Sequence, residues 1–295
     1  EPAIAGLAAE WRRVAVAPVE NNETRYPPLI RRGDVEKALE GGLKRVKREY
    51  WVPFIAHVPL ETRAAIAEWR DGRLTVQSGK QAPFLVRAEI AKALGMAEAD
   101  VRVVSWMPGG GFGGKQHADV EIEAARLARA AGRAVRVHWT REEEFRWSYA
   151  RPAGLMEIET ATDGEGRITA WRHRNYNAGA PGLKPPYEFA DQSSEFWRTP
   201  AAYRQGSYRA LASTANHFAR ESHVDERAAE FGRDPVEYRL RQIADERLRA
   251  VVEKGAARFG WKGRGEGCGM ACTIEKEGRL AVFAEVVRAG TGFRV

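Results

Sequence analysis

The chain has 295 residues, of which 44% are hydrophobic and 29% charged, and its net charge is +7. The length accommodates roughly two domains, and no apolar run reaches the ~18 to 20 residues that cross a bilayer. The sequence therefore predicts a soluble globular protein with no membrane span. Nucleic-acid binding is not expected, because the basic residues alternate with acidic ones, as in residues 141–151, and form no basic stripe.

The N-terminus lacks the basic start and continuous apolar core of a secretion signal. The first residue is Glu1 and not an initiator Met, so we expect a fragment whose true N-terminus is missing. We expect the cytoplasm as its compartment, with the periplasm as the alternative. Cys268 and Cys272 are too few for a disulfide framework and have neither zinc nor redox spacing, so they are interpreted as small residues at a strand edge.

The first third of the chain predicts a linker followed by mixed elements. Residues 1–49 are interpreted as a linker and the end of a preceding domain, and residues 34–50 show helical spacing. Two alternating segments joined by Asp71-Gly72 predict a hairpin, because both central positions of such a turn need positive φ. A helix over 83–95 and a strand over 101–107 follow.

The rest of the chain alternates helices with hairpins, and no repeat is present. Asp234, followed by a proline, is a typical first residue of a helix. The expected elements are a helix over 117–132, a strand over 134–140, a hairpin over 154–179, helices over 215–232 and 234–248, and a strand-turn-strand unit over 283–295.

A glycine-rich loop precedes the helix over 117–132 and fits two nucleotide-binding patterns. Gly109, Gly111 and Gly114 match G-x-G-x-x-G, and the same loop matches the phosphate-loop pattern as far as Lys115. A phosphate loop needs Ser or Thr next, to hold magnesium, and Gln116 stands there. A dinucleotide fold needs repeated βαβ units, whereas this chain continues into antiparallel hairpins. A nucleotide-binding module using Gly109–Lys115 therefore stays as the alternative.

Several segments follow one another in an order typical of one family. They are IAHVPLET (55–62), SGKQAPF (78–84), PGGGFGGK (108–115), WTREEEF (139–145), YRALASTANHFARESHVDE (208–226) and GRDPVEYRL (232–240). Together they resemble the molybdenum-binding large subunits of the xanthine dehydrogenase and aldehyde oxidase family. The resemblance covers residues 50–287.

The chain departs from the family pattern at four quoted positions and in its extent. Leu60, Thr62, Lys80 and Ala210 replace Met, Pro, Thr and Gly. Members of the family continue for several hundred residues to a G-x-G-E motif whose glutamate is the catalytic base. The resemblance implies that this base lies beyond Val295, so no catalytic residue is expected in the chain and the fragment alone is expected to be inactive.

The resemblance implies an α+β fold with mixed and antiparallel sheets and packed helices, the molybdenum-cofactor-binding domain of the aldehyde oxidase type. Residues 50–250 would form the first half of the molybdopterin-binding domain. Residues 251–295 would form the truncated start of a second molybdopterin-binding domain.

The resemblance also implies a function. In this family a molybdenum-molybdopterin cofactor, here expected in the cytosine dinucleotide form, oxidatively hydroxylates a small molecule, and the electrons leave through [2Fe-2S] clusters. We expect those clusters on a partner subunit or domain, an FAD subunit as a further candidate partner, and an oligomer for the full-length protein. A non-catalytic paralogue that serves assembly is a second alternative.

Particular residues correspond to cofactor-binding positions of the family. Gln81 matches a glutamine that hydrogen-bonds a ligand of the metal, and an amide N–H suits that role because it donates without adding charge. Glycines let a loop backbone approach the cofactor, and an arginine offers a fixed cation. The implied cofactor-binding residues are Gln81, Gly110, Gly111, Phe112, Gly113, Arg209 and Ala210.

Gln116, Arg151 and Leu211 match three substrate-facing positions. Xanthine-oxidising relatives carry an acid, an arginine and a phenylalanine there, so this chain lacks a charged acceptor and an aromatic wall. The resemblance therefore favours an aldehyde or N-heterocycle over xanthine. No side chain is expected to bind the metal directly, and the six scattered histidines show no zinc pattern.

Overall fold

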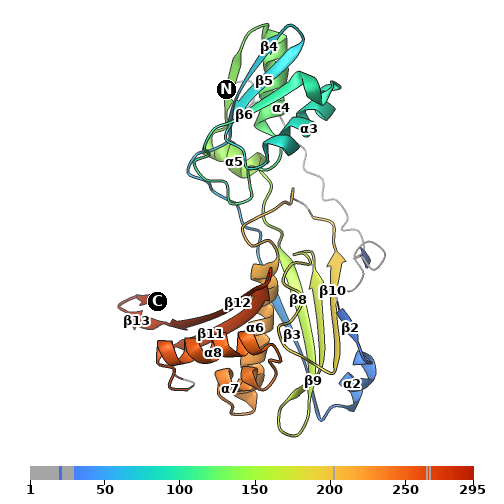
Figure 1. The fold of residues 1–295 in the computed structure, drawn as a ribbon, viewed down its shortest axis with the longest axis vertical. Helices are drawn as coiled ribbons and strands as arrows, with labels where there is room; N and C mark the ends of the chain where they lie inside the picture. The colour runs from blue at the N-terminus through green and yellow to red at the C-terminus, as the bar shows by residue number, and fades with distance from the viewer. Residues whose placement is uncertain (1–19, 22–29, 202, 264, 266) are drawn as a thin grey trace.

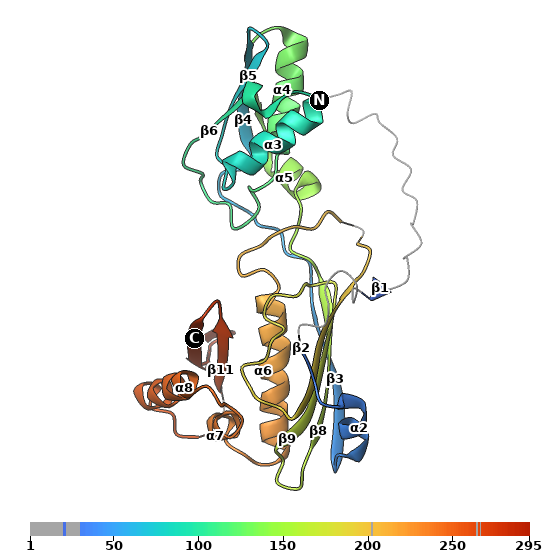
Figure 2. The same cartoon turned by 45° about the vertical axis from the view of Figure 1, so that its right-hand side comes forward.

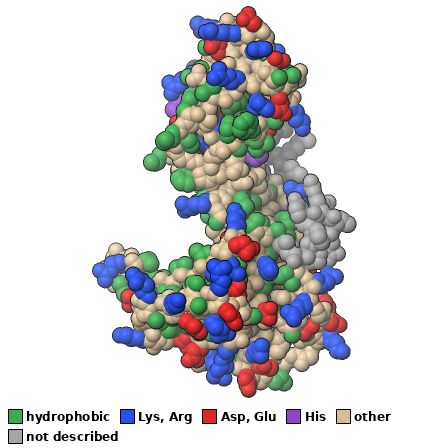
Figure 3. All heavy atoms as spheres, in the orientation of Figure 1, with side chains coloured by type: hydrophobic (Ala, Val, Ile, Leu, Met, Phe, Trp, Pro, Cys, Tyr) green, Lys and Arg blue, Asp and Glu red, His purple; other side chains and the backbone are tan. Residues whose placement is uncertain are grey.

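The computed structural model describes residues 20–21, 30–201, 203–263, 265 and 267–295. Two lobes, joined by a narrow waist, each combine a sheet with helices (Figures 1 and 2). This arrangement confirms the α+β prediction. On the face that Figure 3 shows, basic and acidic side chains are interspersed over the lower lobe, as the mixed-charge pattern predicts.

The upper lobe is a four-stranded sheet with helices packed against it. The Asp71-Gly72 turn closes the predicted hairpin with φ values of 48° and 76°. The third strand lies parallel to the second because a helix carries the chain across, while the fourth is antiparallel to the first. In chain order the elements are β4 (Ala64–Arg70), β5 (Arg73–Ser78), α3 (Pro83–Leu94), the 3-10 turn Glu98–Asp100, β6 (Val101–Ser105), α4 (Val120–Ala131), β7 (Val135–His138) and α5 (Arg141–Trp147).

The lower lobe is built on a long mixed sheet with strand order β1-β10-β9-β8-β3, to which β2 adds by pairing with β10. The predicted hairpin over 154–179 forms its centre, and β10 runs parallel to β9. Helix α2 covers one face and α6 the other (Figure 2). The elements are β1 (Glu20–Asn21), β2 (Ile30–Arg32), α2 (Val35–Gly41), β3 (Lys44–Val52), β8 (Gly154–Thr162), β9 (Ile168–Tyr176), β10 (Asp191–Arg198) and α6 (Ser213–Glu230).

The C-terminal part packs against α6 on the side away from the sheet. Its main hairpin lies on a helix, and its buried face, with Met270 and Cys272, joins the same core as α6 and the sheet. Cys268 and Cys272 are both free thiols. The elements are α7 (Pro235–Leu240), α8 (Glu246–Phe259), β11 (Cys268–Glu275), β12 (Gly278–Glu285), β13 (Val287–Ala289) and β14 (Gly292–Arg294).

The helix expected over 34–50 is wrong beyond its first turns. Helix α2 ends at Gly41, and the chain continues as β3, an edge strand paired with β8. The charged residues whose spacing predicted a helix form ion pairs with the neighbouring strand: Lys47 lies 2.6 Å from Glu157, and Arg45 lies 2.5 Å from Glu159. Tertiary pairing thus overrides the local spacing.

The single helix expected over 234–248 is two helices. Asp234 caps α7 as predicted, accepting the N–H groups of Val236 and Glu237. A second cap, Asp245, accepts the N–H of Leu248 and starts α8 in a new direction. Two elements therefore cross the expected domain boundaries, β3 at 49/50 and α8 at 250/251. Most of the expected linker, 1–19 and 22–29, lies outside the described residues.

Candidate functional site

The glycine loop lies between β6 and α4, at the edge of the upper lobe that faces the waist (Figure 1). Its conformation depends on positive φ at Gly110 (93°), Phe112 (53°) and Gly113 (96°). One carboxylate holds its ends, because Glu61 accepts the N–H of Gly109 at 2.8 Å and pairs with Lys115 Nζ at 2.7 Å. The loop is therefore a fixed structure.

Gln81 fastens the middle of this loop from the start of α3. Its Oε1 accepts the backbone N–H groups of Gly113 and Lys115, each at 3.1 Å. Because two donors fix the oxygen, the orientation of the amide is determined. Its Nε2 makes no hydrogen bond to any other described residue and stays available as a donor. A Cβ at Gly111 would lie 2.4 Å from Oε1 of Gln81, so a larger residue there would displace this side chain.

A second segment, residues 207–213, meets the loop from the lower lobe. Arg209 donates its backbone N–H to the carbonyl of Phe112 at 2.8 Å. A Cβ at Gly113 would lie 2.7 Å from the carbonyl oxygen of Ser207, so only glycine permits this contact. His57 Nε2 donates to the same Ser207 oxygen at 2.6 Å, and burial lowers the pKa of His57. The two segments form one unit.

The segment is strained just before α6 begins. Ala210 (φ 65°) and Leu211 (φ 52°) are consecutive non-glycine residues in the left-handed region. Each costs of order 1 to 2 kcal/mol relative to ordinary backbone. Such outliers cluster at functional sites, where surrounding contacts hold them in place.

A cavity of about 470 Å³ lies where these segments meet. It brings together seven of the ten predicted site residues from three separate parts of the sequence. Four of the eight non-glycine residues with positive φ in the described chain line this one cavity. Its lining residues are Gln81, Phe112, Gly113, Gln116, Ser207, Tyr208, Arg209, Ala210, Leu211, Ser213, Glu275 and Lys276.

Three predicted residues do not line this cavity. Gly110 and Gly111 shape the loop behind it. Arg151 is buried, and its guanidinium donates to the carbonyl of Pro53 at 3.1 Å and to Thr214 Oγ1 at 3.2 Å. Burial lowers the pKa of Arg151. Its contacts join the waist to the start of α6, and its assignment to the substrate stays a prediction.

The geometry argues against the phosphate-loop alternative. The side chain of Lys115 is 2% exposed and paired with Glu61, so its ammonium does not face a ligand. Helix α4 begins only at Val120, so its N-terminal N–H groups do not belong to the glycine loop.

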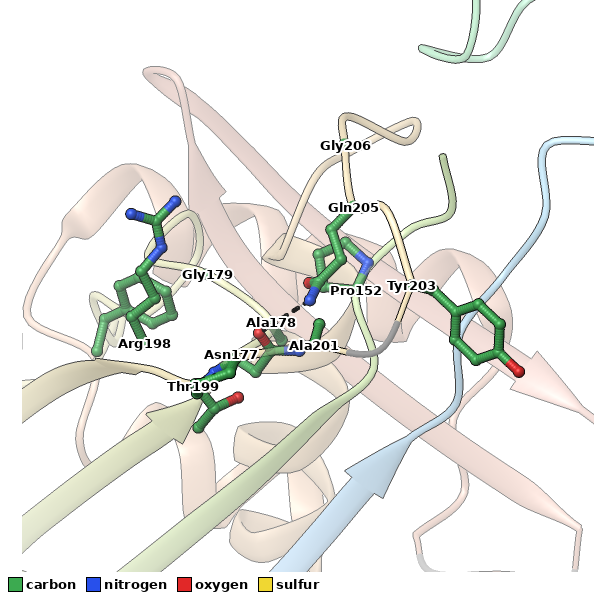
Figure 4. Close-up of a pocket in the computed structure, with 12 residues that line it drawn as sticks. Pro152, Asn177, Ala178, Gly179, Arg198, Thr199, Ala201, Tyr203, Gln205 and Gly206 are labelled. Atoms are coloured by element: carbon green, nitrogen blue, oxygen red, sulfur yellow. Dashed lines mark hydrogen bonds between the residues drawn. The ribbon is translucent and has the colours of Figure 1, made fainter. Parts of the chain in front are cut away.

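A second cavity, of about 530 Å³, lies beside the same segment and contains none of the predicted residues. Figure 4 shows it lined by the ends of β9 and β10, with Gln205 donating to Asn177 Oδ1 at 3.3 Å. Although it is larger, only one described non-glycine residue with positive φ, Asn177, lines it, against four in the first cavity.

Five of the cavity's lining residues and one supporting residue were not predicted from the sequence; the five are Ser207, Tyr208, Ser213, Glu275 and Lys276. Glu275 and Lys276 reach the cavity from the β11–β12 turn. Tyr149 Oη donates to the carbonyl of Gly113 at 2.5 Å, and a Cβ at Gly206 would strike the Tyr149 ring. For Glu275 and Lys276, the sequence offered one signal: Lys276-Glu277 stands at a tight turn between two strands, where Asn or Gly is usual.

Comparison with known proteins identifies the family. The molybdopterin cofactor-binding domain matches residues 17–203, more than half of the chain. The chain belongs to this family. This confirms the resemblance found in the sequence.

Among curated proteins, this molybdopterin-binding chain is 30% identical to a nicotinate dehydrogenase subunit of Pseudomonas putida over 268 residues, covering 83% of the chain and 23% of that protein. It is also 30% identical to the aldehyde oxidoreductase molybdenum-binding subunit PaoC of Escherichia coli K12 over 257 residues, covering 79% of the chain and 35% of that protein. The chain thus spans about a quarter to a third of these relatives, both of which are named as subunits.

Solved structures share the fold. Quinoline 2-oxidoreductase from Pseudomonas putida 86 superposes with a TM-score of 0.72 at 22% identity, covering 87% of this chain and 38% of that one. CO dehydrogenase from Oligotropha carboxidovorans gives 0.71 at 18% identity, covering 79% and 34%. Within the described part of the molybdopterin-binding chain, no helix combines the length and apolar character that a bilayer crossing needs.

Proposed function

We propose that this chain contributes a cofactor-binding site to a molybdenum-dependent oxidoreductase that hydroxylates an aldehyde or an N-heterocycle. The proposal rests on the family membership and on one geometric observation. The free amide Nε2 of Gln81 belongs to the same cavity as the backbone of Phe112 and Gly113 and the guanidinium of Arg209. These are the residues that the sequence resemblance assigned to the cofactor.

The residues present fit a molybdopterin cofactor. Gln81 offers a neutral donor whose direction is fixed by its bonded oxygen. Arg209 makes no ion pair with any described residue, and its guanidinium lies 5.9 Å from the Phe112 ring centre. An unpaired arginine beside a donor suits an anionic, oxygen-rich ligand. When bound, the cofactor would supply the metal that oxidises and hydroxylates an electrophilic carbon.

The chain's own residues would hold and orient that cofactor. Gln81 would donate to an electronegative ligand of the metal, and Gly113 would let the loop and the Ser207 segment close together. Arg209 would balance negative charge. Among the described residues, no group of three His, Cys, Asp or Glu side chains could hold a metal ion. We propose the cytosine dinucleotide form of the cofactor.

The substrate-facing residues favour an aldehyde or an N-heterocycle other than xanthine. Gln116 and Leu211 line the cavity with an amide and an aliphatic group. Neither supplies the carboxylate or the aromatic wall that a purine uses in xanthine-oxidising relatives. We further propose an iron-sulfur subunit, and in some assemblies an FAD subunit, as the route for electrons, an oligomer as the working form, and the cytoplasm as its compartment.

Metal and pterin analysis tests this function. The full-length protein that carries this chain would be purified from a host that makes the cofactor, and its molybdenum and its released pterin would be measured. We expect both in wild type and their loss in Gly113→Val, while Gly132→Val, at a left-handed position with open space around it, keeps both. Tight binding of ATP or NAD without pterin would instead support a nucleotide-binding module, and binding of none of these would support a non-catalytic paralogue.

A further inference from the structure

The turn that joins β11 to β12 is unusual in its residues. Glu275 pairs with Gly278, so Lys276 and Glu277 are the two central residues, with φ values of 46° and 66°. Positive φ at both positions normally selects Asn-Gly or Asp-Gly. The β4–β5 turn of this chain, with the same signs of φ, follows that rule with Asp71 and Gly72. The β11–β12 turn therefore carries two side chains at a conformational cost of order 1 kcal/mol each.

This strained turn is fixed to the candidate site. Oε2 of Glu275 accepts the hydroxyl of Ser213, the first residue of α6, at 2.9 Å. The same oxygen lies 3.7 Å from Nε2 of His217, and that nitrogen is 3.1 Å from Thr273 Oγ1. Four side chains, two from β11 and two from α6, thus hold the end of the hairpin against α6, which places Lys276 at the cavity.

The charges of the cavity are not balanced by the described residues. Arg209 and Lys276 both line it, and neither makes an ion pair or a side-chain hydrogen bond with another described residue. The only lining carboxylate, that of Glu275, is engaged by Ser213. Gln81 and Gln116 are neutral. Two free cations against one bonded carboxylate attract an anion, and charge-assisted hydrogen bonds to oxyanions are the strong ones.

We propose that Lys276 is a binding residue of this cavity and that its ammonium holds an anionic oxygen group of the molecule bound there. The inference deepens the proposed function and rests on it in taking the cavity as a ligand site. Phosphate and carboxylate share the required chemistry. The first can come from the cofactor and the second from a substrate, so the test uses one probe for each source.

The experiment measures anion binding by the purified chain with no cofactor added. Titration calorimetry would use inorganic pyrophosphate as the phosphate probe, benzoate as the carboxylate probe and benzamide as its uncharged counterpart. We expect Lys276→Asn to weaken one or both anions by about tenfold, the worth of one charge-assisted hydrogen bond, with no change for benzamide. If the variant loses pyrophosphate binding alone, Lys276 binds a phosphate of the cofactor. If it loses benzoate binding alone, Lys276 binds a carboxylate of the substrate.

Asparagine makes the variant informative, because it adopts left-handed backbone readily. Lys276→Asn should therefore unfold at the same temperature as wild type or a higher one, which separates a binding role from a structural one. Lys276→Arg should keep most of the anion affinity. The matched control is Lys254→Asn, at an exposed lysine on α8 away from the cavity.

Three outcomes overturn the inference: no binding of either anion by wild type at millimolar concentration, unchanged affinity in Lys276→Asn, or an equal loss in Lys254→Asn. Failure of the proposed function has a different signature. In that case wild type contains no pterin or molybdenum, while the difference in anion affinity between wild type and Lys276→Asn persists.

Discussion

Nζ of Lys115 lies 2.7 Å from Oε2 of Glu61, and the lysine side chain is only 2% exposed. The same carboxylate oxygen accepts the N–H of Gly109. A lysine in this pattern is expected to reach for phosphate, but here it closes the loop from behind. The glycines are therefore free to face a ligand through their backbone, while the charge that would define a phosphate loop is used for structure.

The first prediction concerns this ion pair. Glu61→Ala leaves a buried ammonium without its partner and should lower the free energy of unfolding by about 3 kcal/mol. Lys115→Met leaves a carboxylate that is 35% exposed and still hydrogen-bonded, so the loss should be nearer about 1 kcal/mol. Urea unfolding of both variants shows which one loses more free energy of unfolding. Magnesium-ATP should not raise the melting temperature of wild type. A rise of several degrees would support the alternative that residues 109–115 bind the phosphates of a nucleotide.

Local signals in the sequence predicted much of the fold correctly. The Asp71-Gly72 turn, the left-handed caps Gly95 and Gly132, and the cap Asp234 each act within a few residues, so their chemistry can be read from adjacent positions. Strand β3 was mistaken for helix because its charges find their partners on β8, more than 100 residues away. No local spacing reports such a pairing.

The site shows the same division. The resemblance predicted seven residues that the structure brings into one cavity, because motifs carry family information over long distances in the chain. It did not predict Lys276, whose presence at the cavity depends on the packing of the β11–β12 hairpin against α6 through Glu275 and Ser213. It also did not show that the guanidinium of Arg151 donates hydrogen bonds to the carbonyl of Pro53 and the hydroxyl of Thr214.

The second prediction separates two glycines of the loop. In Gly113→Ala the new Cβ meets the backbone of Ser207 at 2.7 Å and the residue keeps φ of 96°, so we expect a loss of about 3 kcal/mol or more from steric conflict and strain. Gly132→Ala, with positive φ but no neighbour within 4 Å, should lose only about 1 kcal/mol. Thermal unfolding compares the two, and equal losses would mean that segment 207–213 does not press on the loop.

The third prediction tests the amide of Gln81. Gln81→Glu keeps an oxygen that accepts the N–H groups of Gly113 and Lys115, so the stability of the chain should change by less than about 1 kcal/mol. The substitution removes the Nε2 donor and adds a negative charge. We therefore expect a loss of bound pterin and molybdenum, or of turnover in the assembled enzyme by about 10² or more. Normal metal content together with normal turnover would remove Gln81 from the site.

The fourth prediction concerns the strained segment. Ala210→Gly removes the left-handed penalty at φ 65° and should raise the free energy of unfolding by about 1 kcal/mol. The control is Ala93→Gly, at an exposed residue inside α3, which should lower it by about 1 kcal/mol because glycine loses more entropy on folding. Urea titrations that show the same sign for both variants would mean that the conformation of Ala210 carries no strain.

The last prediction uses a histidine in the core of the lower lobe. Burial, with a further contribution from nearby Arg220, lowers the pKa of His173 to about 3. Neither ring nitrogen has a hydrogen-bond partner among the described residues. In the unfolded chain the pKa is about 6.5. The unfolded state therefore binds more protons between these values, and stability is complete above pH 6.5 and is lost as the pH falls toward 3.

At pH 5 this single group should cost about 2 kcal/mol of stability relative to pH 7. His223, whose pKa burial also lowers to about 3, adds a slope of the same sign. His217, whose pKa burial lowers to about 4, destabilises the fold over the same range. His173→Leu should therefore remove about a third of the loss that these three histidines cause between pH 7 and pH 5, or about 2 kcal/mol. At pH 7 the variant should be at least as stable as wild type, because an unpaired buried polar group is gone. Urea unfolding at several pH values measures the slope, with His117→Gln, at a ring that is 42% exposed, as the control. A slope that His173→Leu leaves unchanged would show that this histidine is hydrated or hydrogen-bonded in solution.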